Sequence, residues 1–434
     1  MKTIKRYTQG LVALFALLAG VALTACEDQP DKYEVADGVP TVKYVRLPAP
    51  VSADSLLTGA YMENTICLVG DNLRSIVELY FNDQKAVLNT SYMTDHTLLV
   101  DVPKNIPEEV TDKLYMITRA NDTIPYDFKV LVPAPAVNSL SCEFAAPGSE
   151  VTIYGDYLLD DPNTPLTIEM AGNVKVTNIT SISKTQVSFV LPANAIEGYI
   201  TVTSLYGTGR SKFVYHDTRN ILFDWDDSHG GLATGHGWRA GVVRVDDPVA
   251  GIDGSYLYFG GAAIDGAAGA TWAEDQFCFN YWPEPSAGYP ALSAMPKFAE
   301  MLSEYGWDKL QLKFEVNVPA SNPWQSAALQ AMFTSDADVT NATGNNNYYS
   351  SDKLPRGLWL PWNGPGSYDT GGKWVTVSMK LADFNKTPTG TACAESLNPD
   401  HFTGLTFFVW NGGLAGTTCN PVICFDNIRV VPVE

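Results

Sequence analysis

The chain has 434 residues and a formal charge of −20 at pH 7. This acidic balance argues against nucleic acid and against an anionic membrane surface as partners, because both reward lysine and arginine. The length exceeds what a single hydrophobic core accommodates and predicts about two to four domains. All ten tryptophans lie at or after Trp225, so the second half of the chain differs in kind from the first.

Residues 1–25 have the features of an export signal. Lys2, Lys5 and Arg6 precede an apolar run over residues 11–23, which is too short and too early for a membrane-spanning helix. The run ends in Leu23-Thr24-Ala25-Cys26, which resembles a bacterial lipobox. In that class of signal the cysteine becomes the lipidated first residue of the mature protein. The resemblance therefore implies a lipid anchor on Cys26.

Residues 26–40 are acidic and contain prolines, so we interpret them as a tether between the anchor and the first domain. Glu27, Asp28 and Asp31 resemble the surface-export tag of Bacteroidetes lipoproteins, although the usual leading serine is missing. The resemblance implies display on the outer face of the outer membrane. A lipoprotein facing the periplasm is the alternative.

A repeat follows the tether. Residues 65–73 are echoed by residues 150–158, with Gly70 and Gly155 in register, and residues 97–103 are echoed by residues 186–192. Apolar residues alternate over short runs between glycine, proline, asparagine and aspartate, which is typical of a β-sandwich. The strand-Gly-Asp-x-Leu element resembles the immunoglobulin-like TIG (IPT) repeat, in which the glycine allows a tight bend. We expect two such domains, at residues 41–133 and 134–217.

These two domains carry no sign of a ligand site. Residues 41–216 contain no tryptophan and only two histidines, His96 and His216, so neither a stacking platform nor a catalytic cluster is visible. Pro133 and Pro135 predict a stiff junction, because proline fixes φ and removes a backbone donor. The pair is predicted to be a stalk.

The composition changes near Tyr215, where glycine, tryptophan and asparagine become frequent, and we expect a third domain at residues 218–434. Strand-like segments at 220–227 and 422–431 resemble the paired terminal strands of jelly-roll carbohydrate-binding modules. With the lipobox and the TIG-like repeats, the chain resembles a Bacteroidetes surface glycan-binding lipoprotein of a Sus-like polysaccharide utilisation locus. Its group is typified by a C-terminal xyloglucan-binding domain.

That resemblance implies an all-β fold, with two tandem Ig-like (TIG/IPT) β-sandwiches followed by a larger jelly-roll-like carbohydrate-binding β-sandwich. It also implies a lipid-anchored protein of the outer membrane surface that binds a neutral polysaccharide and holds it for degradation and import. Plant or fungal β-glucans such as xyloglucan, mixed-linkage glucan or laminarin are the implied ligands. A TonB-dependent transporter and a companion glycan-binding lipoprotein are the implied partners.

The alternation of apolar and polar residues along the strands predicts which side chains of the third domain face the core and which do not. In residues 310–318 the apolar positions alternate with polar ones, so Glu315 and Asn317 are expected on an open face. Trp374 belongs to the polar side of the strand at 374–381. Residues 405–410 are bulky on both faces, which predicts a central strand with Trp410 in the core.

Flat aromatic rings in turn-rich segments are the candidates for stacking on sugars. Neighbouring prolines stiffen two of these segments and lower the entropy of holding a ring ready. The predicted glycan-binding residues are Trp272, Tyr281, Trp282, Trp324, Trp359 and Trp362. Core packing or loop anchoring is the alternative for each ring. Trp225, Trp238 and Trp307 are expected to be structural.

Two other functions remain open. A glycoside hydrolase or lyase needs two carboxylates about 5–10 Å apart across the scissile bond. The available acids are Glu274, Asp275, Glu284, Glu315 and Glu395, and their spacing along the chain identifies no pair. An adhesin built on Ig-like repeats is the other alternative, against which the tryptophan-rich third domain counts. We predict a binding protein without catalytic residues.

No cofactor or metal is predicted. His229 and His236 lack a third ligand, and Asp224, Asp226 and Asp426 suit a structural calcium less well than they suit turn capping. The cysteines after Cys26 show no C-x-x-C spacing and are expected to be buried free thiols, with one disulfide, such as Cys393 to Cys419, as the alternative.

Overall fold

The computed structural model describes residues 35–434 except 240, 270–272, 341–346, 411 and 413. The chain divides into two compact units, Met1–Pro133 and Ala134–Glu434. The export signal, Cys26 and Trp272 lie outside the described residues, so their predicted roles stay predictions. No helix in the described part of the chain is long and apolar enough to cross a membrane.

The first unit is a β-sandwich. Strands β1, β3 and β6 form one sheet, β5, β4, β7 and β8 form the other, and β2 pairs with β9 in parallel. Leu68, Leu79 and Leu114 are among the fully buried residues between the sheets. The strand bounds are β1 Thr41–Arg46, β2 Gly59–Tyr61, β3 Thr65–Asp71, β4 Ile76–Phe81, β5 Gln84–Lys85, β6 Thr97–Asp101, β7 Lys113–Thr118, β8 Thr123–Asp127 and β9 Lys129–Leu131.

The second unit begins with a similar sandwich. Its sheets have the strand orders β10-β11-β15-β14 and β13-β12-β16-β17, and they enclose a separate core around Ile153, Phe189 and Val202. The strand bounds are β10 Ala136–Leu140, β11 Glu150–Asp156, β12 Thr167–Met170, β13 Val174–Lys175, β14 Ile179–Ile182, β15 Gln186–Val190, β16 Thr201–Ser204 and β17 Gly207–Arg210.

Gly70 and Gly155, the matching glycines of the repeat, are required for the same structural reason. Strand β3 pairs with β1 and strand β11 with β10, and each pairing shifts register next to the glycine. A Cβ at Gly70 would lie 1.8 Å from the Thr41 carbonyl oxygen, and one at Gly155 would lie 1.9 Å from that of Ala136. Close approach of two backbones, rather than the expected tight bend, therefore requires glycine at both positions.

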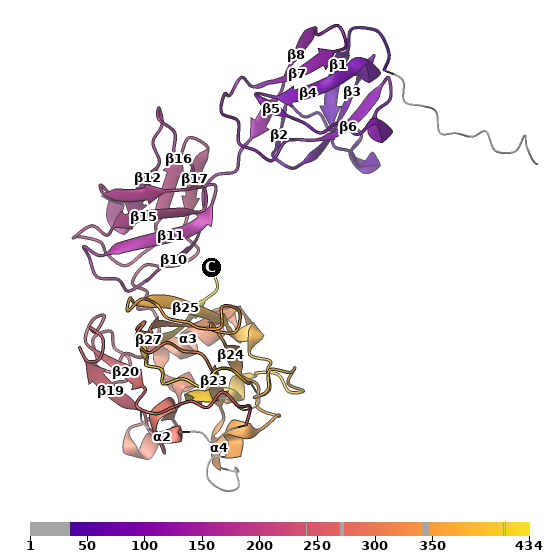
Figure 1. Cartoon of the computed structure of the whole chain (residues 1–434). Helices are drawn as coiled ribbons and strands as arrows, with labels where there is room; N and C mark the ends of the chain where they lie inside the picture. Colours follow the sequence, from indigo (N-terminus) through magenta and orange to yellow (C-terminus); the bar gives the residue numbers. More distant parts are fainter. Residues whose placement is uncertain (1–34, 240, 270–272, 341–346, 411, 413) are drawn as a thin grey trace, which may run out of the picture. The chain divides into compact units, whose positions relative to one another are not determined.

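The remaining residues form a larger sandwich of a six-stranded and a four-stranded sheet. The first has the order β19-β20-β27-β22-β25 with β18 also paired to β27, and the second has the order β21-β26-β23-β24. One core of aromatic and aliphatic side chains lies between them, and Figure 1 shows helices α2 and α4 at one end of this domain. The bounds are β18 Ile221–Phe223, β19 Val242–Val245, β20 Ser255–Phe259, α2 Glu274–Phe277, β21 Cys278–Tyr281, α3 Pro296–Tyr305, β22 Leu310–Asn317, β23 Ala328–Thr334, α4 Asp336–Thr340, β24 Gly357–Trp359, β25 Val375–Lys380, β26 Gly404–Trp410 and β27 Ile423–Pro432.

This architecture confirms the predicted fold. The first and last strands of the third domain, β18 and β27, pair antiparallel as expected from the jelly-roll likeness. Strand β26 is central, between β21 and β23. Trp410 at its end is half-buried, because it lies on the outward side of that sheet with Phe408 rather than in the main core.

The open face predicted for residues 310–318 is wrong, since every residue of β22 is buried. Its polar side packs against the second Ig-like domain through Glu143. The Glu143 carboxylate accepts from Lys313 Nζ at 2.5 Å and from Arg429 Nη2 at 2.8 Å, while Arg429 Nη1 bonds Glu315 at 2.7 Å. Two acids and two bases thus neutralise each other inside the second unit, where an isolated charge would be costly.

Trp374 belongs to the same covered surface. Its indole Nε1 donates to the Ala250 carbonyl at 2.8 Å, and its ring packs edge-on against Tyr256. It also packs against the core of the second Ig-like domain, so the ring serves the contact between the two domains of this unit.

The cysteines after Cys26, and the aspartate considered for calcium at the start of the third domain, lie in the described part of the chain. Cys393 and Cys419 are free, as are the other cysteines after Cys26, so no disulfide joins them. Asp224 accepts from the backbone amides of Asp227, His229 and Gly231 and caps a turn. Within the described ranges no group of three or more His, Cys, Asp or Glu residues is arranged to hold a metal ion.

Candidate functional site

Three of the predicted contact residues lie in the core. Trp324 and Tyr281 are fully buried and Trp362 is nearly so. Their polar atoms bond backbone carbonyls: Trp324 Nε1 that of Ser326, Trp362 Nε1 that of Ala327 and the Tyr281 hydroxyl that of Pro290. None of these rings presents a face to a ligand, so their assignment to the platform is corrected to core packing.

Trp282 is half-buried and stays a candidate. It follows Tyr281 directly, and successive side chains near a strand point to opposite faces, so the core position of Tyr281 directs Trp282 outward. Its Nε1 donates to the Tyr348 hydroxyl at 3.2 Å, and the two rings meet edge to face. The ring is therefore fixed in orientation at the outer side of the four-stranded sheet.

The segment at residues 236–239 runs beside Trp282. The Trp282 amide donates to the His236 carbonyl at 2.8 Å, and His236 Nδ1 lies 2.7 Å from the Trp282 carbonyl oxygen. Gly237 has φ of +131°, and a Cβ there would lie 2.9 Å from the Trp282 ring. Glycine is thus required for this segment to pack onto the indole.

Trp238 follows that glycine and is 61% exposed. The sequence had indicated a structural role for it, and the structure corrects this. Its backbone is held by Arg239, whose amide donates to Asn280 Oδ1 and whose guanidinium donates to the Trp238 carbonyl. Because the backbone is already held, stacking on a ligand has to order only the two side-chain torsions of this indole.

Polar side chains surround the two indoles. Arg239 pairs with Asp275 at 2.7 Å and with Glu274 at 3.7 Å. His236 stacks on the half-buried Tyr289 ring with centroids 3.9 Å apart, and its Nε2 lies 3.2 Å from Glu284. Of the acids considered for a hydrolase, Glu274 and Asp275 thus pair with Arg239 and Glu284 lies next to His236, while Glu315 is buried elsewhere with Arg429.

A buried polar network supports the site from behind. Asn280 Nδ2 donates to the hydroxyls of Tyr348 at 3.1 Å and Tyr349 at 3.0 Å. Arg356, fully buried, bonds the Gln330 side chain and the Tyr349 carbonyl. Burial lowers the pKa of Arg356 to about 10 and raises that of Tyr349 well above its ordinary value. These bonds hold residues 347–356 against the sheet and fix the support under Trp282.

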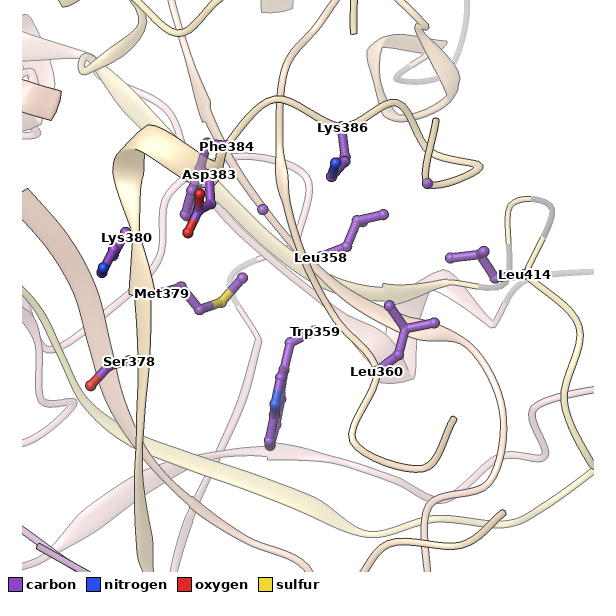
Figure 2. A pocket seen from close by; sticks show the side chains of 12 residues that line it. Leu358, Trp359, Leu360, Ser378, Met379, Lys380, Asp383, Phe384, Lys386 and Leu414 are labelled. Carbon is purple, nitrogen blue, oxygen red and sulfur yellow. The ribbon is translucent and has the colours of Figure 1, made fainter. Parts of the chain in front are cut away.

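Trp359 lines a separate groove of about 500 Å³. Its ring packs edge-on against Phe314, Trp324 and Tyr368 and is half-buried. Figure 2 shows the ring at the groove. The residues lining it are Gly357, Leu358, Trp359, Leu360, Ser378, Met379, Lys380, Asp383, Phe384, Lys386, Gly390 and Leu414. The structure therefore does not join the predicted residues into one platform.

A family model for the surface glycan-binding protein B xyloglucan binding domain matches residues 215–432, half of the chain. The chain belongs to the surface glycan-binding protein B family. A model for the IPT/TIG domain matches residues 135–217, which is the second Ig-like sandwich. The resemblance to TIG-containing surface glycan-binding proteins is confirmed.

Solved structures include other members of the surface glycan-binding protein B family. A surface glycan-binding protein from Prevotella bryantii is 39% identical, with 92% of this chain and 100% of that chain covered and a TM-score of 0.77. The SGBP-B from a complex xyloglucan utilization locus in Bacteroides uniformis is 17% identical over 91% of this chain and 100% of its own, with a TM-score of 0.41.

An IPT/TIG domain-containing protein from Bacteroides ovatus is 26% identical over 244 residues, which cover 51% of this chain and 48% of that relative. The alignment thus spans about half the length of the relative.

Sequence reasoning missed Trp238 in this glycan-binding domain, although a signal was present. Gly235 and Gly237 flank His236 directly before Trp238, and glycine can mark a close approach of the backbone to a neighbour. The sequence indicates a structural role for Trp238, because it does not show that Trp282, far away along the chain, lies next to this segment. The backbone bridge between His236 and Tyr281 is a tertiary feature and places the segment that carries Trp238 next to the end of β21.

Proposed function

We propose that this protein binds a neutral β-glucan, such as xyloglucan, mixed-linkage glucan or laminarin, through Trp238 and Trp282 of the third domain. The exposure of Trp238 beside Trp282 carries the proposal, within a domain of a glycan-binding family. Neutral sugars offer C–H faces that stack on indoles and hydroxyls that bond to carboxylates and guanidinium groups. Both kinds of partner occur here, in the indoles and in Arg239, Asp275 and Glu284.

The magnitude of stacking supports useful affinity. By analogy with nucleobase stacking, each ring contributes about 1–3 kcal/mol. Two rings with a few hydrogen bonds reach about 8 kcal/mol, which corresponds to micromolar binding. Many copies on one cell surface would raise the avidity further.

Affinity electrophoresis in gels containing single polysaccharides tests this proposal. We expect retardation in at least one neutral β-glucan gel and release of no reducing sugar from it. Sugar release would favour a hydrolase or lyase built on the acids around Arg239. Unchanged mobility in every gel would contradict glycan binding and favour an adhesin. Retardation in a gel of a different polysaccharide alone would refute the assignment to β-glucans.

We further propose that the protein is a lipoprotein of the outer membrane surface that holds glycan for degradation and for uptake by a TonB-dependent transporter. The sequence Leu23-Thr24-Ala25-Cys26 and the acid residues after it support this. A Cys26→Ala variant should lose incorporation of labelled fatty acid and leave the membrane fraction. Surface display predicts that an external protease digests the wild-type protein on intact cells. Protection of the protein until the outer membrane is opened would contradict display.

A further inference from the structure

The groove beside Trp359 lies where the two sheets of the third domain end. Strand β24 is the last strand of the four-stranded sheet, and β25 is the last strand of the six-stranded sheet. Both strands line the groove, together with the connection after β25. In the view of Figure 2, Leu358, Leu360 and Leu414 lie on one side and Ser378, Met379 and Lys380 on the other. The groove is therefore an opening of the sandwich between two sheet edges.

The floor of this groove is apolar and firmly packed. A Cβ at Gly357 would lie 2.7 Å from the Phe384 ring and 2.8 Å from the Met379 methyl carbon, so these two side chains fill the space that glycine leaves. The edge-on contacts of Trp359 with core rings fix the indole. A ligand would meet a prepared surface, because ordering these side chains on binding costs little.

The rim of the groove carries both kinds of hydrogen-bonding partner. Asp383 is exposed and accepts, and Lys386 is half-buried and donates. Within the described residues neither side chain has a hydrogen bond or ion pair to another group. A volume of about 500 Å³ falls within the range of small-molecule sites. Ser378 and Lys380 line the groove as well. An apolar floor below such acceptors and donors suits the C–H face and the hydroxyls of a sugar ring.

The groove lies across the sheet from Trp282. Strands β21 and β24 are the two outermost strands of the four-stranded sheet, with β26 and β23 between them. Three strand spacings of about 4.8 Å, or roughly 14 Å, separate these two strands. Trp282 and Trp359 are also offset along the sheet, because Tyr281 is level with Phe333 of β23 and Trp359 is level with Leu329. Trp282 follows β21 and Trp359 ends β24, so aromatic residues flank both edges of one rigid sheet.

We propose that the groove is a second site of the third domain for a neutral sugar unit, so that one domain contacts β-glucan at two places. This inference rests on the proposed function, in which Trp238 and Trp282 form the first site. Contact with one chain at both places joins two weak interactions through a rigid spacer and raises affinity for long chains over short ones.

Paired variants separate the two sites. Asp383→Ala with Lys386→Ala alters only the groove rim, and Trp238→Ala alters only the first site. Lys373→Ala with Glu395→Ala is the matched control, because it removes the same two charges from exposed positions outside the groove. Retention of the wild-type melting temperature establishes that each variant is folded.

Isothermal titration with a defined β-glucan oligosaccharide should give two sites for the wild type and the control, and one each for the other two variants. With the polysaccharide, the groove variant should bind at least fivefold more weakly than the control. A single site in the wild type, unaffected by the groove variant, would overturn the second site and leave the proposed function intact. No binding by the wild type would overturn both.

A labelled Met379 methyl group reports the groove directly, even where heat signals are small. Its NMR resonance, assigned with Met379→Leu, should shift in a saturable manner with the oligosaccharide, and it should still shift in the Trp238→Ala protein. A resonance that stays in place while the wild type binds oligosaccharide would overturn the proposal.

Discussion

The buried charge cluster between the second Ig-like domain and the third domain offers a sharp test of how the second unit is held together. Glu143→Ala removes the carboxylate that bonds Lys313 at 2.5 Å and Arg429 at 2.8 Å. Glu315 then faces two buried cations alone. Breaking a buried pair by removing one partner costs about 3–5 kcal/mol. For a unit of this size the melting temperature should fall by on the order of 10 °C.

Chemical and thermal denaturation of the second unit, followed by circular dichroism, measures this loss. Glu150→Ala is the control, because Glu150 lies in the same Ig-like domain and its exposed side chain accepts from the exposed Thr180 hydroxyl. It should change stability by no more than about 0.5 kcal/mol. A Glu143→Ala protein as stable as this control would refute the view that the cluster is buried and mutually dependent.

Three further predictions concern the fold. Gly155→Ala should destabilise the second unit by about 3 kcal/mol, because the new Cβ meets the Ala136 carbonyl at 1.9 Å; urea unfolding with a normal midpoint would contradict this. Burial raises the pKa of Asp426 well above its usual range, so its contribution to stability is full below about pH 4 and is lost as the pH rises through the folded pKa. Asp426→Asn should therefore flatten the fall in melting temperature as the pH rises above about 4, and an unchanged slope would count against it. In native protein that lacks Cys26, a thiol reagent should modify Cys393 first, because the other thiols are buried. Burial also raises the pKa of the Cys424 thiol to about 12, which slows its reaction. Rapid reaction of every thiol would contradict this prediction.

Local patterns in the sequence predicted the architecture well. The repeated strand-Gly-Asp-x-Leu element and its second echo mark the same paired strands in both Ig-like domains, β3 with β6 and β11 with β15. These features depend on alternation and on glycine positions, which a sequence displays directly. The reason for the glycines was hidden, because the clash partner of each one lies on another strand.

The side chains at the site were harder to place. Periodicity placed Glu315 on the polar side of β22 correctly, but the domain that covers that side supplies Glu143 from far away in the sequence. Tyr281 and Trp282 are neighbours in sequence, yet Tyr281 points into the core and Trp282 points outward. Which of the two is buried depends on the orientation of the strand in the folded domain. Pro323 beside Trp324 indicated a rigid ring, and the ring is rigid because it is buried.

The most direct test of the central claim is titration of a defined β-glucan oligosaccharide into Trp238→Ala and wild-type protein, with Trp307→Ala as a control from outside the proposed site. Loss of one stacking ring worth about 1–3 kcal/mol should raise Kd at the first site by roughly 5-fold to 150-fold. The melting temperature should stay unchanged, because the Trp238 ring is 61% exposed. Wild-type affinity in a folded Trp238→Ala protein would contradict the assignment of this ring to the glycan site.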